Sequence, residues 1–424
     1  MRLLIFVIYD IALFIAVLFF LPLYALRKKI NFEALLEKLT IVIPVKKIEE
    51  SIWIQAVSVG EVISIRALVD NLQNYFSFRI VISTTTLTGK KVAKNIYGNK
   101  ADIIFLPFDI TFLVKRIIKR INPKIFIAIE TEIWPNLFYQ LYKKKIPIVI
   151  LNGRISDKAY KRYKKIKFIT EKILSLCSYI GVQNNFYLER FLSLGASSDR
   201  IAISGNIKFA NIIVKQKKLL NFKDEYLSLL KHKSKFLFIA ASTHSREEKA
   251  ILEVYKSIKE RFSCNLLIAP RHPERTKEVE KEVRRTGLIA LRISQLREKE
   301  DILDKCVFIL DTVGDLFYFY SIADVCFVGG SLFDYGGHNI LEPLYFSKPT
   351  LFGPYMSNFK EIEEVVLEKK AAIKVQDKKQ LRYYIERILF DDEFREVLCK
   401  NASKIFEHQR ALVKKNIEII KSLL

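Results

Sequence analysis

The sequence has 424 residues, of which 70 are Lys or Arg and 46 are Asp or Glu, so its formal net charge is +24. Half of the residues are hydrophobic, which excludes a disordered scaffold, because such chains are poor in aliphatic and aromatic side chains. The five cysteines form no C-x-x-C pair, which argues against a zinc ribbon or a disulfide mini-protein and predicts free thiols in a reducing cytosol.

The N-terminal segment is the first predicted element. From Leu3 to Leu26 it is apolar except for Asp10, and a basic run follows at 27–29. About 20 such residues suffice to cross a bilayer, and no small-x-small cleavage site follows them. Because more positive charge follows the segment than precedes it, we expect the remaining chain on the cytoplasmic side. Residues 1–26 are therefore predicted to be a membrane anchor, and Asp10 and Pro22 leave open a helix that lies in the interface.

The body of the chain alternates short β-branched runs with helical stretches, which is typical of parallel sheets covered by helices on both faces. A polar, Lys-rich stretch at 214–234 separates two such sets. We therefore predict an α/β protein with two doubly wound, Rossmann-like domains, at 27–213 and 214–424, whose last helix (394–424) could pack on either domain. The predicted strands are 53–59, 79–83, 103–106, 124–129, 147–151, 179–182, 201–204, 236–240, 265–269, 307–310, 325–328 and 350–352.

Acidic side chains follow two predicted strands of the first domain. In open α/β sheets ligands bind at the carboxyl ends of the strands, so residues at these ends are candidates for a site. Glu61 follows strand 53–59, and a helix is expected from near Val62. A Glu in a first helical turn often only offsets the helix dipole, so a structural and a functional interpretation of Glu61 both remain open.

Glu130 and Glu132 follow strand 124–129. Two carboxylates so close together raise each other's pKa or require a cationic partner, which suits acid–base chemistry, although solvated loop charges look the same in a sequence. Lys208 follows strand 201–204 and is either a cation that stabilises negative charge or an ordinary surface lysine.

Glycine-rich and polar loops follow the predicted strands of the second domain. Glycines let the backbone approach a phosphate, and helix N-termini offer free N–H groups to it. A carboxylate one turn into such a helix, like Glu342, can accept hydrogen bonds from both hydroxyls of a ribose. One loop alone is weak support, since turns need glycine anyway, but five loops in one domain favour nucleotide binding. The loops are 240–244, 269–275, 311–315, 329–331 and 336–343.

Six segments together resemble the motifs of the Kdo transferases, the 3-deoxy-D-manno-octulosonic acid transferases of lipopolysaccharide assembly. The resemblance covers nearly the whole chain, including the apolar N-terminus. It implies a GT-B fold and an inverting transfer of Kdo from CMP-Kdo to a lipid A precursor (lipid IVA), without a metal or cofactor. It also implies a place on the cytoplasmic face of the inner membrane, with anionic lipids but no nucleic acid as partners. The segments are 58–61 (SVGE), 130–136 (ETEIWPN), 205–209 (GNIKF), 241–244 (ASTH), 270–275 (PRHPER) and 336–343 (GGHNILEP).

The resemblance also implies roles for single residues. Glu61 would be the general base that deprotonates the acceptor hydroxyl, and Glu130 and Lys208 would stabilise the transition state. Asp315 stands where the family usually has the longer Glu, so a backbone contact to the nucleotide is expected there. The residues that would hold CMP are Pro270, Arg271, Val313, Gly314, Asp315, Asn339, Ile340, Leu341 and Glu342.

A basic stretch at 158–172 carries seven Lys or Arg, with apolar residues at steps of three or four. This spacing predicts a helix with one apolar and one basic face. The basic face is either merely solvated or binds anionic headgroups and acceptor phosphates. Two other functions stay open at this point, a GT-B transferase that uses a UDP-sugar and a non-catalytic, membrane-tethered protein that binds anionic polymers or RNA.

Overall fold

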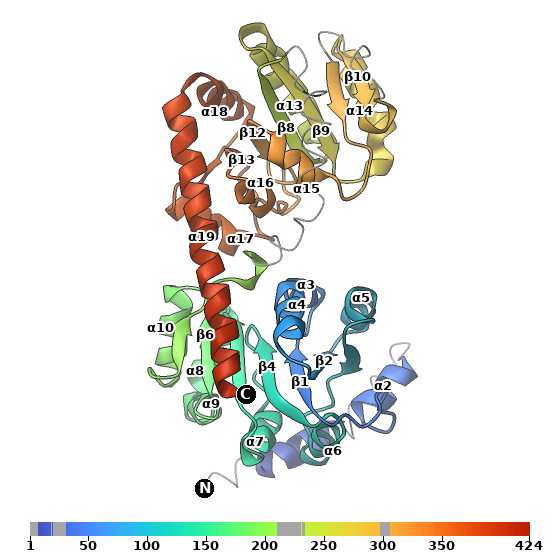
Figure 1. Cartoon of the computed structure of the whole chain (residues 1–424), viewed down its shortest axis with the longest axis vertical. Coiled ribbons are helices and arrows are strands. Elements are labelled where there is room, and N and C mark those ends of the chain that lie inside the picture. Colours follow the sequence, from blue (N-terminus) through green and yellow to red (C-terminus); the bar gives the residue numbers. More distant parts are fainter. Residues whose placement is uncertain (1–6, 18, 20–30, 210–229, 231–233, 297–305) are drawn as a thin grey trace. The chain divides into compact units, whose positions relative to one another are not determined.

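The computed structural model describes residues 7–17, 19, 31–209, 230, 234–296 and 306–424. The chain divides into two compact units (Figure 1). The first unit consists of Met1–Ile213 together with Gln409–Leu424, and the second unit of Val214–His408. All five cysteines are free thiols, as predicted.

The first unit is built on a parallel sheet that has seven strands within the described residues, in the order β3-β2-β1-β4-β5-β6-β7. The strands are β1 (Ser51–Gln55), β2 (Arg79–Thr84), β3 (Asp102–Phe105), β4 (Pro123–Ile129), β5 (Ile148–Gly153), β6 (Tyr179–Val182) and β7 (Ile201–Ile203). The helices are α2 (Phe32–Lys38), α3 (Val59–Ser64), α4 (Arg66–Tyr75), α5 (Leu87–Tyr97), α6 (Thr111–Ile121), α7 (Pro135–Lys143), α8 (Asp157–Lys165), α9 (Lys167–Leu174), α10 (Asn185–Ser193) and the 3₁₀ turn η1 (Ile207–Phe209).

Both faces of this sheet are buried, and the side chains of β1 demonstrate it. Ile52 and Ile54 lie in the hydrophobic core on one side of the sheet. Trp53, between them in sequence, points to the core on the other side, where its ring meets Phe126 edge-on at 5.0 Å. Because successive side chains of a strand point to opposite faces, helices must cover both of them.

The second unit has the same plan, with strand order β10-β11-β9-β8-β12-β13-β14 and parallel pairing throughout the described part. The two parallel sheets confirm the predicted α/β class. The strands are β8 (Phe236–Thr243), β9 (Cys264–Pro270), β10 (Ile289–Arg292), β11 (Cys306–Ile309), β12 (Val325–Val328), β13 (Thr350–Phe352) and β14 (Ala372–Lys374). The helices are α13 (Ser245–Arg261), α14 (Thr276–Arg285), α15 (Leu316–Phe319), α16 (Leu341–Tyr345), α17 (Lys360–Glu368), α18 (Lys378–Phe390) and α19 (Asp392–Leu423), with 3₁₀ turns η3 (Pro273–Arg275), η4 (Ile293–Gln295) and η6 (Tyr320–Ile322).

Several elements differ from their predicted form. Strands β10 and β14 were not predicted, because they are short, partly exposed edge strands without a continuous apolar run. The strand expected at 53–59 ends at Gln55, and the helix expected from near Val62 begins at Val59. The stretch 158–172 forms two helices, α8 and α9, separated at Ile166.

The helix α19 belongs to both units, since residues up to 408 pack in the second unit and residues from 409 in the first. Within the first unit, Asn416 of this helix donates a hydrogen bond from Nδ2 to the carbonyl of Ser204 at 3.1 Å. Gln409 accepts one from the backbone N–H of Asn206 at 3.0 Å. The C-terminal turns of the chain therefore help to hold the segment that follows β7.

The expected membrane anchor at 1–26 lies partly outside the described residues. Of this segment, residues 7–17 form a helix. Asp10, its lone acidic residue, accepts hydrogen bonds at 2.8 Å from the N–H of Thr111 and from the Nδ2 of Asn136. None of the helices in the described ranges is long and apolar enough to cross a membrane.

Candidate functional site

Each sheet has one point where its topology reverses. In the first unit the chain passes from β1 to β2 and β3 on one side, and then returns to β4 on the other side of β1. In the second unit the same reversal falls between β8 and β12. Open α/β sheets bind ligands outside the carboxyl ends of the strands at such a point. The candidate residues lie at these ends in both units.

Glu61 follows β1 at the reversal point of the first sheet. It forms a capping box with Ser58, in which the Ser58 side chain accepts from the Glu61 N–H. The Glu61 carboxylate in turn accepts the N–H of Val57 at 2.8 Å and that of Ser58 at 3.3 Å. Because the backbone fixes both carboxylate oxygens and the residue is only 7% exposed, its orientation is set before any substrate arrives. The capping role and a functional role are compatible.

Glu130 stands directly after β4, on the other side of the reversal point. Its φ of 63° lies in the left-handed region, which costs a residue with a Cβ free energy and is enriched at functional sites. The N–H of Glu130 donates to the carbonyl of Leu151 at 2.9 Å. Its carboxylate accepts a hydrogen bond from the Nε of Arg154 at 2.6 Å, just after β5. Strand pairing and an ion pair thus hold Glu130 in this conformation.

The acidic groups of this site influence one another's ionisation. Burial, together with the charges of Glu61 and Glu130, raises the pKa of Glu132 to about 7, although the hydrogen bond from the Trp134 indole lowers it. Burial also raises the pKa of Glu130, and the negative charge of Glu61 raises it too. The positive charges of Arg154 and Lys208 lower it. Three carboxylates and two cations therefore form one electrostatic cluster.

Lys208 enters this cluster from the turn after β7. Its N–H donates to the Asn206 side chain at 3.0 Å, and the N–H of Ile207 donates to the Asn152 side chain at 3.3 Å. Gly205 has a φ of 77°, and a Cβ there would lie 2.5 Å from the Oε1 of Gln409. A side chain at this φ would be strained and would displace the Gln409 amide, so the GNIKF motif has a steric reason for its first residue.

The structure thus brings the three predicted catalytic residues, Glu61, Glu130 and Lys208, into one site of the first unit. Sequence reasoning missed Arg154, which pairs with Glu130, and gave Glu132 no separate role. Arg154 could have been found by the same rule as the others, because it follows the predicted strand 147–151 at the carboxyl edge.

In the second unit, Glu247 of α13 binds the glycine loop that follows β12. This fully buried carboxylate accepts the N–H groups of Gly330, Ser331 and Leu332 at 2.8, 3.0 and 2.9 Å. A Cβ on Gly329 would lie 2.7 Å from the Glu247 carboxylate. Glu247 therefore fixes the Gly-Gly-Ser loop against the N-terminus of α13, a role that the sequence did not reveal.

A histidine cluster lies beside this loop. The Nε2 atoms of His244 and His338 are 3.0 Å apart, and the His244 ring stacks on Tyr335 at 4.1 Å. Burial lowers the pKa of His338 to about 4, helped by the nearby positive charge of Arg271. Burial also lowers the pKa of His244. Near neutral pH these imidazoles are uncharged, and a neutral imidazole can donate one N–H to an anion while Arg271 supplies the charge.

The residues expected to hold CMP all lie at the carboxyl edge of the second sheet. Pro270 ends β9, and the N–H of the exposed Arg271 donates to the carbonyl of Thr243 at 3.0 Å. The segment 313–315 follows β11, the neighbour of β9, and Gly314 adopts a φ of 93° with open space around it. Val313 is 84% exposed, and Asp315 is the N-cap of α15.

The remaining expected CMP residues form the start of α16. The Asn339 side chain accepts the N–H of Leu341 at 3.1 Å, Ile340 and Leu341 are buried, and Glu342 lies half-buried in the first turn. Phe317 of α15 packs on Phe346 after α16, with ring centroids 4.9 Å apart. The helices that follow these two loops therefore pack together. Among the described residues, no three His, Cys, Asp or Glu side chains are grouped as a metal site would need.

Comparisons with known proteins agree with this architecture. Residues 33–211 match the family model described as 3-deoxy-D-manno-octulosonic-acid transferase (kdotransferase). A 3-deoxy-D-manno-octulosonic acid transferase from Haemophilus influenzae is 34% identical over 88% of this chain and 87% of its own length. A bifunctional glycosyltransferase/methyltransferase from Fusobacterium nucleatum is 35% identical over 81% of this chain, which spans about half (53%) of that longer relative.

A solved structure extends the comparison to the fold. The UDP-GlcNAc 2-epimerase from Neisseria meningitidis, bound to UDP-GlcNAc, matches 85% of this chain and 99% of its own with a TM-score of 0.55 and 15% identity. At that identity the likeness concerns the fold alone, two Rossmann-like domains of the GT-B kind. With the sequence relationship to the Haemophilus enzyme, it follows that this chain is a glycosyltransferase that belongs to the 3-deoxy-D-manno-octulosonic acid (Kdo) transferase family.

Proposed function

We propose that this chain transfers Kdo from CMP-Kdo to a hydroxyl group of a lipid A precursor, lipid IVA, with inversion at the anomeric carbon. One observation carries the proposal. In a member of the Kdo transferase family, Glu61, Glu130 and Lys208 form one electrostatic cluster at the carboxyl edge of the first sheet. That is where a nucleophile would need a base and where developing charge would need compensation.

The proposed base is Glu61. As the acceptor oxygen forms its bond to the anomeric carbon of Kdo, Glu61 takes the hydroxyl proton. The bond between that carbon and the phosphate oxygen breaks, and its electron pair leaves with CMP. The two backbone N–H groups that bind the Glu61 carboxylate support this role, because they hold it oriented while each oxygen keeps a lone pair for the proton.

Arg154 has a positioning role in this proposal. Its hydrogen bond to Glu130 at 2.6 Å and its positive charge oppose the rise in the pKa of Glu130 that burial causes, and so favour the charged carboxylate. A charged Glu130 offsets Lys208 and stabilises the positive charge that grows on the sugar as CMP departs. Lys208 would in turn stabilise the negative charge that accumulates on the leaving phosphate.

The proposed donor site is the loop cluster of the second unit. Arg271 and the neutral His338 would bind the phosphate of CMP, and Glu342 would accept hydrogen bonds from the ribose hydroxyls. The short helix α16 starts at Leu341 and carries Glu342 in its first turn. The left-handed conformation of Gly314 gives the backbone room to approach the base.

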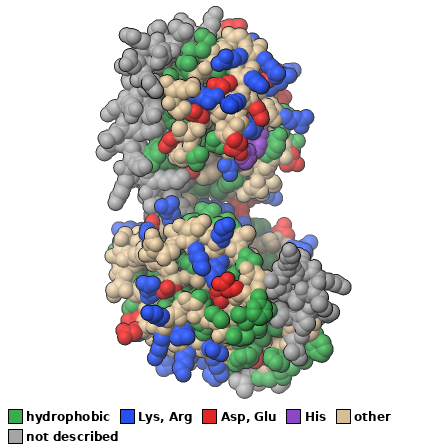
Figure 2. Space-filling model, turned by 90° about the vertical axis from the view of Figure 1, so that its right-hand side faces the viewer, with side chains coloured by type: hydrophobic (Ala, Val, Ile, Leu, Met, Phe, Trp, Pro, Cys, Tyr) green, Lys and Arg blue, Asp and Glu red, His purple; other side chains and the backbone are tan. Residues whose placement is uncertain are grey.

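We place the enzyme on the cytoplasmic face of the inner membrane, where its acceptor would lie. The apolar side chains of the N-terminal helix, such as Ile8 and Ile11, are more than half exposed and support this proposal. None of the residues of α8 is buried, so its lysines are accessible to anionic headgroups. Figure 2 shows Lys and Arg side chains gathered at one end of the first unit.

The test is to incubate the detergent-solubilised protein with CMP-Kdo, with and without tetraacylated lipid A precursor. We expect CMP release that depends on the acceptor, together with a mass increase of one or more Kdo units on the lipid. Glu61→Gln should lower turnover about 10²–10⁴-fold and still bind CMP. CMP release without a change in lipid mass would exclude this acceptor, and turnover of UDP-sugars but not CMP-Kdo would exclude the proposed donor.

A further inference from the structure

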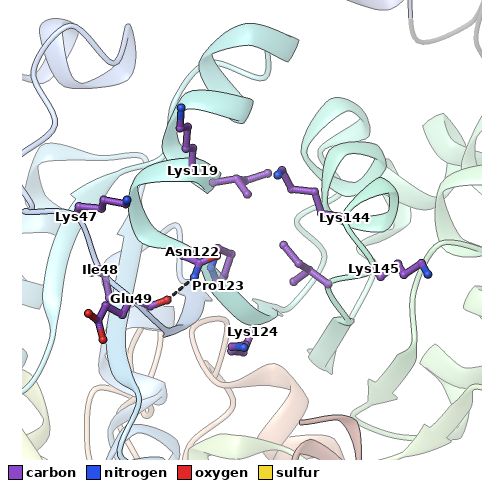
Figure 3. Close-up of a pocket in the computed structure, with 11 residues that line it drawn as sticks. Lys47, Ile48, Glu49, Lys119, Asn122, Pro123, Lys124, Lys144 and Lys145 are labelled. Atoms are coloured by element: carbon purple, nitrogen blue, oxygen red, sulfur yellow. Dashed lines mark hydrogen bonds between the residues drawn. The ribbon is translucent and has the colours of Figure 1, made fainter.

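A basic pocket of about 860 Å³ lies in the first unit, away from the carboxyl cluster (Figure 3). Its walls come from the residues that precede β1, β4 and β5, so it occupies the amino edge of the sheet, whereas Glu61 and Glu130 lie at the carboxyl edge. Its volume falls within the range of about 300–1,000 Å³ that is usual for small-molecule sites. We call it the lysine pocket. Its lining residues are Lys47, Ile48, Glu49, Ile118, Lys119, Asn122, Pro123, Lys124, Lys144, Lys145 and Ile146.

The charge of the lysine pocket is strongly one-sided, since its lining has five lysines and one carboxylate. Lys47 and Lys144 reach into it from opposite sides, whereas Lys145 and the Glu49 carboxylate point away (Figure 3). Lys124 forms an ion pair with Glu50 at 2.7 Å, just outside the lining. The two ammonium groups that project into the pocket have no ion pair with any described residue.

A structural explanation for the lysines accounts for only part of this charge. Helices α6 and α7 both end at the pocket, and each helix C-terminus carries about half a negative charge that lysines commonly offset. Those two ends, with Glu49 and Glu50, amount to about three negative charges, against five lysines. Roughly two positive charges remain, and they repel each other unless an anion joins them.

We propose that the lysine pocket binds a phosphomonoester. Such a group carries about −1.5 to −2 charges near pH 7, which matches the surplus, and its three terminal oxygens can accept hydrogen bonds from Lys47 and Lys144 together. Ile118 and Ile146 supply apolar wall for the body that carries the phosphate. Because it lies at the opposite edge of the sheet from Glu61, this site is distinct from the transfer site and does not depend on the proposed reaction.

The test compares two variants that lose the same charge. Lys47→Gln/Lys144→Gln removes the inward lysines, and Lys91→Gln/Lys94→Gln removes two exposed lysines of α5 as a control. Inorganic phosphate is titrated calorimetrically, and sedimentation is measured with phosphatidylcholine vesicles that contain phosphatidate. Both variants leave the second unit unchanged, so phosphate that binds there contributes equally to both titrations. The difference in affinity between the two variants therefore measures phosphate binding in the lysine pocket. We expect the pocket variant to bind at least about tenfold more weakly than the control, since charge-assisted hydrogen bonds contribute about 1.5–3 kcal/mol each.

The two probes separate the sources of the phosphate. A pocket-dependent loss with inorganic phosphate supports a free ligand, and a loss with phosphatidate vesicles alone supports a lipid headgroup. Equal losses in both variants, or none in either, would overturn the proposal. The proposal would also be overturned if phosphatidylglycerol vesicles bound as tightly as phosphatidate vesicles and lost binding equally in the pocket variant, because the phosphodiester of phosphatidylglycerol carries a single charge. Circular dichroism of both variants checks that these surface substitutions leave the fold intact.

Discussion

Glu132 is the carboxyl group of the transfer site whose ionisation falls near neutral pH. Its pKa is raised to about 7, because it is buried and lies close to the charges of Glu61 and Glu130. Below that pH Glu132 is mostly neutral, and above it a further negative charge joins Glu61 and Glu130 and stabilises the positive charge that develops on the sugar. We therefore expect kcat to rise as the pH passes through about 7 and Glu132→Gln to remove this rise.

Measurement of pH–rate profiles of the wild type, Glu132→Gln and Glu61→Gln tests this division of roles. Loss of a general base lowers the rate by about 10²–10⁴-fold, so Glu61→Gln should be slow at every pH. Should Glu132→Gln instead show that large loss while Glu61→Gln stays active, the base would be Glu132 and Glu61 would only cap α3.

Two glycines illustrate opposite consequences of one extra methyl group. Gly330 has a φ of 67°, and a Cβ there would lie 2.6 Å from the half-buried His338 ring. Gly60 lies within α3, where the nearest atom to a Cβ would be 3.8 Å away. We expect Gly330→Ala to weaken CMP binding at least about tenfold and to cost about 1–3 kcal/mol of stability, as strained backbone positions do. Gly60→Ala should stabilise the protein by up to about 1 kcal/mol.

Calorimetric titration with CMP and urea unfolding of both variants provide the comparison. The prediction fails if Gly330→Ala binds CMP as tightly as the wild type, since the loop would then tolerate a side chain beside His338.

At the scale of elements, Asp109 links the segment after β3 to helix α7. Its carboxylate accepts the N–H of Asn136 at 3.0 Å and that of Leu137 at 2.8 Å, and so caps this helix. Burial raises its pKa to about 7 despite these hydrogen bonds. A carboxyl group whose pKa is higher in the folded state holds a proton that the unfolded chain releases, so its contribution to stability is full below about pH 4 and is lost as the pH rises through about 7.

We therefore expect the unfolding temperature of the first unit to decrease as the pH rises from 4 to 7. In Asp109→Asn this decrease with pH should be less steep. Glu189→Gln removes an exposed carboxylate of the same unit and serves as a control that keeps the wild-type slope. Thermal scans at several pH values give the slopes, and an identical slope in Asp109→Asn would contradict the assignment.

The same elements explain what the sequence could and could not predict. Buried central strands such as β4 were predicted because they are continuous apolar runs, and the carboxyl ends of β1 and β4 pointed to Glu61 and Glu130. The predicted edge strand β7 pointed to Lys208 in the same way. The edge strands β10 and β14 lack such runs and were missed. The Glu247 contacts with residues 330–332 join parts of the chain more than 80 positions apart, and no local pattern encodes that distance.

At the scale of the whole molecule, we propose that the N-terminal helix attaches the protein to a membrane. Asp10 bonds to Thr111 and Asn136, so this side of the helix faces the first unit. Ile8, Ile11 and Ile15 are spaced by three and four residues and lie on one face, and they are 58%, 55% and 48% exposed. A helix held by a polar contact on one side and apolar on the other suits the plane of the interface rather than a crossing of the bilayer.

This orientation predicts which substitutions release the protein from membranes. Ile11→Glu/Ile15→Glu should lower binding to phosphatidylethanolamine/phosphatidylglycerol vesicles at least about tenfold, since each buried aliphatic side chain contributes about 1.5–3 kcal/mol. Phe390→Glu/Val397→Glu alters two exposed apolar residues of the second unit and should not change the binding. Sedimentation of the full chain with the vesicles measures both. If the two double variants lose binding equally, added negative charge rather than the helix face determines membrane association, and the helix does not lie in the interface as argued.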